Sequence, residues 1–133
     1  MSVDAGAVSR WFDEFFDTFS ACNRGDREMA ALLGCYDVPL ILTTDDGVIA
    51  LMTDDEAAAL WQSQAEGLRA MGYHHTEVLH SEVTVLNSTS ALYRASLSRR
   101  DHDGGEIGCP AVTYLITEGS AGLRIVVLAV HGQ

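Results

Sequence analysis

The feature that most constrains the fold of this chain is a change in the spacing of its apolar residues. Up to about residue 24 they recur every three or four positions, which is the period of one helix face. From residue 73 onward, long segments alternate between apolar and polar residues, which is typical of strands with one buried face. This order predicts an α+β protein in which N-terminal helices pack on an antiparallel sheet. The apolar residues of the first segment are Val8, Phe12, Phe15, Phe16 and Phe19.

Three helices are expected. The first covers residues 4–24, and a short second one covers about residues 27–33. The third begins at Thr53 and Glu56, whose T-x-x-E spacing is a capping box, and it ends before Gly72. All three lie before the long alternating segments.

A hairpin is predicted at Asp46-Gly47, between strands over residues 36–44 and 48–52. Pro39 has no N–H to donate to a ladder, so the first of these strands is expected at a sheet edge. Long strands in a small sheet must twist and coil, so a strongly bent sheet is expected. The long strands are predicted at residues 73–86, 91–100, 107–117 and 123–131. On the first two of these, alternation puts Leu79, Tyr93 and Leu97 on the face expected to pack on the helices.

The last two strands are apolar on both faces. Val112 and Tyr114 alternate with Leu115, and Leu128 follows Val127. One face can pack on the helices, and the other needs a cover that this chain does not supply. A second copy is the simplest cover, so a symmetric homodimer through the sheet is predicted.

Composition excludes several classes of function. The chain of 133 residues has the usual size of one domain, and no linker or repeat divides residues 1–133. Its formal net charge is −11 and its eight basic residues are all arginine, so it lacks the basic footprint of a nucleic-acid or membrane-surface binder. Without lysine, Schiff-base catalysis and a P-loop are excluded. Three cysteines without a C-x-x-C pair indicate reduced thiols, as in a cytoplasmic protein.

Several short motifs occur together with the predicted order of elements. They are Tyr36-Asp37-Val38-Pro39, Asp103-Gly104-Gly105, Thr113-Tyr114-Leu115 and Leu123-Arg124-Ile125. Together they resemble the nuclear transport factor 2-like superfamily, a cone-shaped cystatin-like α+β roll that includes polyketide-cyclase-like and ketosteroid-isomerase-like proteins. The resemblance covers nearly the whole chain, and it implies a deep pocket between the helices and the concave sheet, usually in a dimer. It does not imply one activity, because this fold carries isomerases, cyclases, dehydratases and non-enzymatic binders.

Two residues are candidate catalytic bases. The resemblance to isomerase-like proteins implies a carboxylate near the first strand, and Asp37 is the nearest match. A carboxylate in an apolar cavity has a raised pKa, which suits a general base. His75 is the other candidate, because Glu77 lies two residues further on the same strand face. In a one-base scheme Tyr36 or Tyr93 would polarise the substrate.

Aromatic residues at the ends of elements are candidates for a ligand-binding wall with polar tips. His131 has the parity of Ile125 and Val127 and is expected to face the cavity from its open end. His74, His75 and His80 cannot chelate one ion from a regular strand, so no metal is predicted, and no motif implies a cofactor. The expected ligand-binding residues are Tyr36, Trp61, Tyr73, Tyr93 and His131.

Three functions remain open at this point. The leading hypothesis is a domain that binds a small apolar organic ligand in a largely apolar pocket. The first alternative is a one-base isomerase, cyclase or dehydratase acting on a polyketide- or steroid-like substrate. The second alternative is a protein-interaction module.

Overall fold

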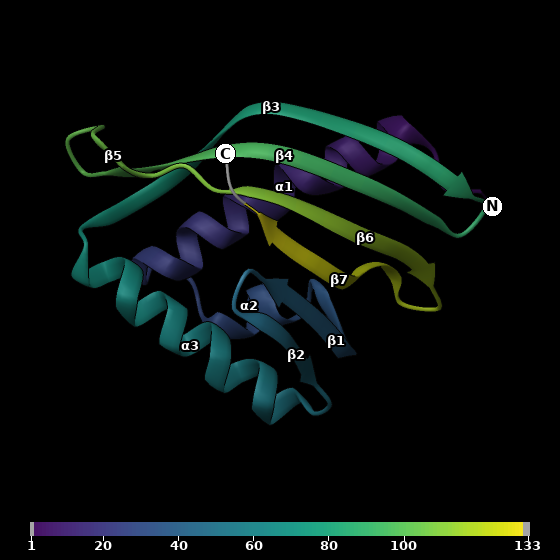
Figure 1. Cartoon of the computed structure of the whole chain (residues 1–133), viewed down its shortest axis with the longest axis horizontal. Coiled ribbons are helices and arrows are strands. Elements are labelled where there is room, and N and C mark those ends of the chain that lie inside the picture. Colours follow the sequence, from purple (N-terminus) through teal and green to yellow (C-terminus); the bar gives the residue numbers. More distant parts are fainter. Residues whose placement is uncertain (1, 132–133) are drawn as a thin grey trace.

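Three helices pack on the concave face of one curved sheet (Figure 1). The structure is a computed structural model that describes residues 2–131. The helices are α1 (Ala5–Arg24), α2 (Met29–Leu33) and α3 (Asp54–Ala70). The strands are β1 (Tyr36–Thr44), β2 (Gly47–Leu51), β3 (Tyr73–Asn87), β4 (Ser90–Asp101), β5 (Glu106–Gly108), β6 (Ala111–Gly119) and β7 (Gly122–His131). The predicted α+β class, with helices first and a bent sheet after them, is confirmed.

Both long helices begin at side-chain caps. The Asp4 carboxylate accepts a hydrogen bond from the Ala7 N–H at 2.8 Å, which satisfies a donor at the start of α1. Thr53 Oγ1 accepts from the Glu56 N–H at 3.1 Å, and the Glu56 carboxylate accepts from the Met52 N–H at 3.1 Å. These reciprocal bonds close the predicted capping box of α3, with the return bond one residue earlier than in the usual form.

The sheet is mixed. Its strand order is β2-β1-β7-β6-β4-β3, with β5 paired to β4. Within residues 2–131 the β1–β7 pair is parallel and the other strand pairs are antiparallel, which corrects the expectation of a purely antiparallel sheet.

The prediction that Pro39 places β1 at a sheet edge is wrong, because β1 lies between β2 and β7. The pairing of β1 with β7 is interrupted between Tyr36 and Ile41, and its pairing with β2 starts at Leu40. Pro39 therefore lies where neither ladder needs its missing N–H.

β3 is bulged at several points, and the bulges change which side chains face the helices. Its register with β4 shifts between Tyr73 and His75, between Val78 and His80, and near the end of the strand. Thr76 pairs with Arg99 on the inner face, whereas Leu79, expected to face the helices, is 57% exposed. A single extra residue moves every following side chain to the opposite face of the sheet. A prediction from uniform alternation therefore puts the side chains in the first half of this strand on the wrong face.

The core lies between α1 and the middle of the sheet. The ring of Phe12 stacks on Tyr93 with centroids 3.9 Å apart, and it also contacts Tyr114 at 5.1 Å. All three rings are buried, so aromatic contacts around Phe12 hold α1 against β4 and β6. The same packing leaves space further along the sheet, between α1, α3 and the ends of β3 and β4.

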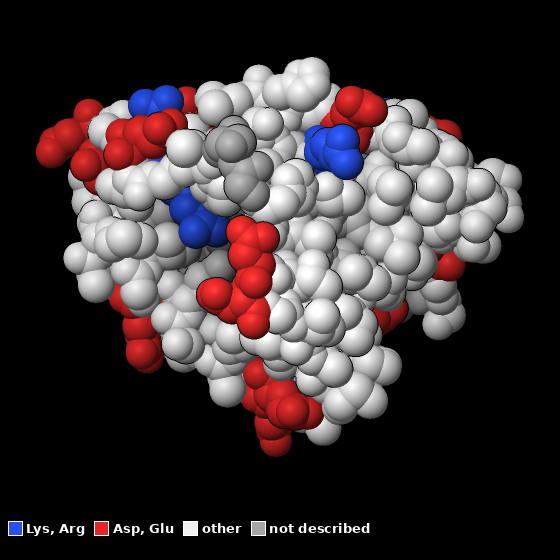
Figure 2. All heavy atoms as spheres, in the orientation of Figure 1, with Lys and Arg blue, Asp and Glu red and all other residues white. Residues whose placement is uncertain are grey.

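The surface carries most of the charge. Acidic side chains are spread around the face shown in Figure 2, with few arginines among them. Among residues 2–131, no helix is both long enough and apolar enough to cross a bilayer.

Candidate ligand-binding site

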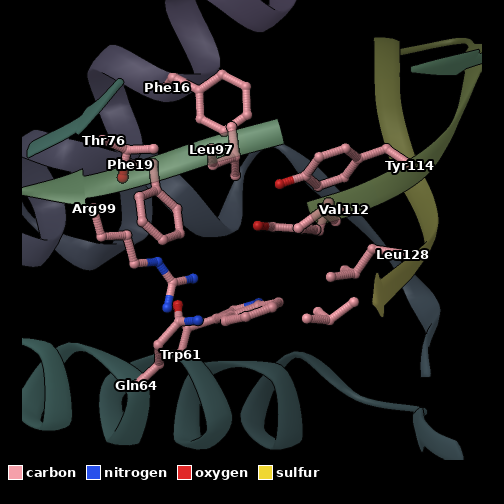
Figure 3. Close-up of a pocket in the computed structure, with 12 residues that line it drawn as sticks. Phe16, Phe19, Trp61, Gln64, Thr76, Leu97, Arg99, Val112, Tyr114 and Leu128 are labelled. Carbon is pink, nitrogen blue, oxygen red and sulfur yellow. The ribbon is translucent and has the colours of Figure 1, made fainter. Parts of the chain in front are cut away.

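A small cavity lies between α1, α3 and the inner face of the sheet (Figure 3). Its free volume is about 30 Å³, which at roughly 10–15 Å³ each is room for two or three water molecules. Its apolar wall consists of Phe16, Phe19, Leu97, Val112, Leu128 and Val130. Its polar side chains are Tyr36, Trp61, Gln64, Thr76, Arg99 and Tyr114.

Arg99 is the one charged side chain among the described residues that line the cavity. It extends from β4 and its guanidinium points into the cavity above α3 (Figure 3). Its Nε atom is buried and has no hydrogen-bond partner within residues 2–131, and no acidic side chain of that part of the chain lies within 4.0 Å. Burial lowers the pKa of the guanidinium below its usual range, although an arginine remains charged near neutral pH.

α3 contributes two further polar atoms from successive turns. Trp61 Nε1 and Gln64 Oε1 are both buried, and neither has a partner among residues 2–131. The Trp61 indole forms the cavity floor in Figure 3 and stacks on Tyr36, with centroids 4.9 Å apart and planes at 23°. A buried polar atom without a partner costs about 1–3 kcal/mol, so three around one small cavity are a marked departure from ordinary packing.

Two tyrosines bring hydroxyl groups to the site. Burial raises the pKa of both Tyr36 and Tyr114 above the ordinary value for a phenol. Both therefore stay protonated at neutral pH and can donate a hydrogen bond. The Tyr114 hydroxyl points toward the cavity centre from the side opposite Arg99 (Figure 3).

A hydroxyl network holds the wall next to Arg99. The Tyr73 hydroxyl lies 2.6 Å from Thr76 Oγ1 and 3.2 Å from Ser20 Oγ, and the Thr76 N–H donates to Ser20 Oγ at 3.1 Å. These bonds tie β3 to α1. Tyr73 thus lies behind the lining residue Thr76 and is outside the set that lines the cavity.

A second, wider cleft of about 290 Å³ lies between α2, β1 and α3 and also includes Tyr36. Within residues 2–131, none of its lining side chains carries a buried polar atom without a partner. The first cavity, which has such atoms, is therefore the better candidate for a ligand-binding site.

Of the five residues expected to bind a ligand, the structure brings together Tyr36 and Trp61 at the cavity. Tyr93 is stacked flat on Phe12 in the core. His131 lies on the outer face of the sheet, where its Nε2 is 2.9 Å from Thr113 Oγ1. The expectation that His131 faces the cavity is wrong. Val126 is an extra residue in the β6–β7 pairing, so the side chains after it point to the opposite face from the one that strict alternation predicts.

The two predicted catalytic bases also lie outside the cavity lining. Asp37 is exposed, and it follows Tyr36 in a strand whose successive side chains point to opposite faces. His75 Nε2 is 2.9 Å from the Glu77 carboxylate, and its Nδ1 is 2.9 Å from Nδ1 of His74. The hydrogen bond from His75, helped by Arg100, lowers the pKa of Glu77. A catalytic role for Asp37 or His75 stays a prediction.

The structure also identifies lining residues that sequence reasoning missed. Arg99 lies at an odd-numbered position of β4, as do Tyr93, Ala95 and Leu97, which face the helices. Its inward orientation could therefore have been predicted from the alternation in the sequence. Gln64 lies one helical turn after Trp61. Thr76 had no such signal, since a bulge in β3 decides its face. Among residues 2–131, no group of three His, Cys, Asp or Glu side chains is arranged to hold a metal ion.

Solved structures show the same fold. A protein of unknown function with a cystatin-like fold from Nostoc punctiforme has a TM-score of 0.74 at 10% identity, covering 98% of this chain and 94% of that chain. A domain of unknown function with this fold, also from Nostoc punctiforme, has a TM-score of 0.69 at 23% identity, covering 98% of this chain and 77% of that chain. An NTF2-like protein from Novosphingobium aromaticivorans has a TM-score of 0.65 at 19% identity, covering 95% of this chain and 86% of that chain.

Identities this low show similarity of fold alone. A comparison with curated proteins gives no significant match. In sequence, the model of the family described as NTF2-like protein (DUF6841) matches residues 4–133, nearly the whole chain. The resemblance to nuclear transport factor 2-like proteins is thereby confirmed, and the chain belongs to this NTF2-like family.

Proposed function

We propose that this domain binds a small organic molecule in the cavity between α1, α3 and the sheet. The observation that carries the proposal is the set of three buried polar atoms, on Trp61, Gln64 and Arg99, that have no partner within residues 2–131. An apolar cavity with a few convergent polar groups is the usual form of a small-molecule site. A free volume of about 30 Å³ suits a small ligand or the polar end of a longer one.

The positions of the titratable groups favour binding over a one-base reaction. Asp37 and His75 both lie outside the cavity lining. Tyr36 and Tyr114 line it, but burial raises the pKa of each, which makes both poor bases at neutral pH. The groups around the cavity are therefore suited to hold a ligand by donating hydrogen bonds.

The proposal is tested by NMR titration of small neutral and charged fragments, read on the indole N–H of Trp61. A Trp11→Phe background leaves this as the one indole signal, since the chain has two tryptophans. Fragments should shift it, and Val130→Phe, which fills the cavity edge, should abolish the shift. Val48→Phe, the same substitution at an exposed position of β2 outside the cavity lining, should leave it intact. An unresponsive indole, or equal responses in both variants, would contradict ligand binding here.

We also propose that a second copy of the chain covers the outer face of the sheet. Four apolar side chains form a continuous row across β1, β7, β6 and β4 on this face, and each is partly exposed. Such a row is suited to a self-complementary contact about a two-fold axis. The row consists of Ile41, Val127, Leu115 and Leu92.

A further inference from the structure

We infer that the ligand of this cavity is a small organic carboxylate, whose carboxylate group binds Arg99 and whose apolar body lies against the Trp61 indole. This inference rests on the proposed ligand-binding function and names the chemical class of its ligand. It replaces the purely apolar ligand expected from the sequence with an amphipathic one.

The charges around the cavity support an anion. Arg99 brings a positive charge to the cavity, and no carboxylate is among the lining side chains in residues 2–131. Among residues 2–131, two other arginines do have a carboxylate within 4.0 Å: Arg24 pairs with Asp26 at 2.9 Å, and Arg100 lies 3.8 Å from Glu77. A partly buried cation without a counterion is unfavourable, so a ligand that supplies a negative charge gains more than a neutral one.

The donors are suited to a carboxylate. A guanidinium presents N–H groups in a planar fork that matches the two oxygens of a carboxylate. The buried Nε–H of Arg99 is available for such a pair. The Trp61 Nε1–H lies on the floor and the Tyr114 hydroxyl approaches from the opposite side (Figure 3), so further donors surround the same small space.

The rest of the lining suits an apolar body. Phe16, Phe19 and the Trp61 indole supply aromatic surface next to the guanidinium. The free volume of about 30 Å³ accepts the carboxylate end first, and a body larger than a few atoms needs the side chains around it to move apart. A short aliphatic acid or a single-ring aromatic acid has this combination of size and polarity.

The experiment compares carboxylates with their neutral amides. Propionate is titrated against propionamide, and benzoate against benzamide, at neutral pH, with the Trp61 indole N–H and the Arg99 Nε–H as NMR reporters. The wild-type protein should bind at least one carboxylate about tenfold or more tightly than its amide, because hydrogen bonds to a charged group are stronger than neutral ones. The net charge of −11 opposes any anion from a distance, so this preference must arise inside the cavity.

Arg99→Met should remove the preference, so that each carboxylate binds no more tightly than its amide. Arg94→Met is the matched control: Arg94 lies on the same strand, is exposed and faces the outer side, and its loss changes the net charge equally. Arg99→Lys keeps the charge without the planar fork and should weaken carboxylate binding several-fold. If Arg99→Met does not fold, the wild-type preference and Arg99→Lys still decide the question.

The outcomes separate the two claims. Carboxylates and amides that shift the indole equally, or a preference that survives Arg99→Met, would overturn the inference while the binding function stands. A cavity that responds to neither class would overturn both. A carboxylate preference that is lost with Arg99 and kept with Arg94→Met supports both.

Discussion

Tyr36 and Tyr114 are buried phenols whose protonation depends on the fold. In the unfolded chain a tyrosine loses its proton near pH 10, whereas burial raises the pKa of Tyr114 above that value in the folded protein. Between these two values the folded state binds more protons, so the free energy of unfolding falls as pH rises.

Tyr114→Phe removes one such phenol. We expect its free energy of unfolding to fall less than that of the wild type as pH rises above about 10. Urea denaturation at several pH values from about 8 to about 11 measures this slope. Trp11→Phe removes no titrating group and should keep the wild-type slope. An unchanged slope in Tyr114→Phe would show that this phenol does not contribute.

At the scale of elements, the capping box stabilises the first turn of α3. Thr53→Ala removes the side-chain acceptor for the Glu56 N–H and should lower the free energy of unfolding by about 1 kcal/mol. Ser63→Ala, at an exposed position inside the same helix, should be neutral or slightly stabilising. Urea denaturation of the two variants checks the difference, and equal stabilities would refute the role of the cap. Because α3 carries Trp61 and Gln64, a frayed start also loosens the cavity floor.

Elements differ in how well local sequence predicts them. The caps at Asp4 and Thr53 act within one turn, so the helix starts could be predicted within a residue or two. The hairpin at Asp46-Gly47 is equally local, and its strands are where they were expected. The bulges in β3 and near Val126 depend instead on pairing with strands that are distant in the sequence. For this reason parity assigned Tyr93 and Leu97 to the correct face but failed for Leu79 and His131.

At the scale of the whole molecule, the outer row of Leu92, Leu115, Val127 and Ile41 predicts association. Leu115→Arg places a charge in the middle of this row and should convert a wild-type dimer into a monomer, because an unpaired charge in an apolar contact is strongly unfavourable. Light scattering after size-exclusion chromatography measures the mass. Leu86→Arg, at an exposed apolar position near the end of β3, should leave the dimer intact. A wild-type protein that is monomeric at micromolar concentration would contradict the homodimer.

The sequence by itself determined the α+β class, the helix starts, the order of the strands along the chain and the aromatic candidates Tyr36 and Trp61, because caps, turns and periodicity act over a few residues. Only the tertiary structure decided the parallel β1–β7 contact, the internal position of Pro39 and the bulges that set the strand faces. It also decided which groups meet at the cavity. Arg99, Gln64 and Trp61 come from β4 and α3, and their lack of partners depends on how helix and sheet pack together.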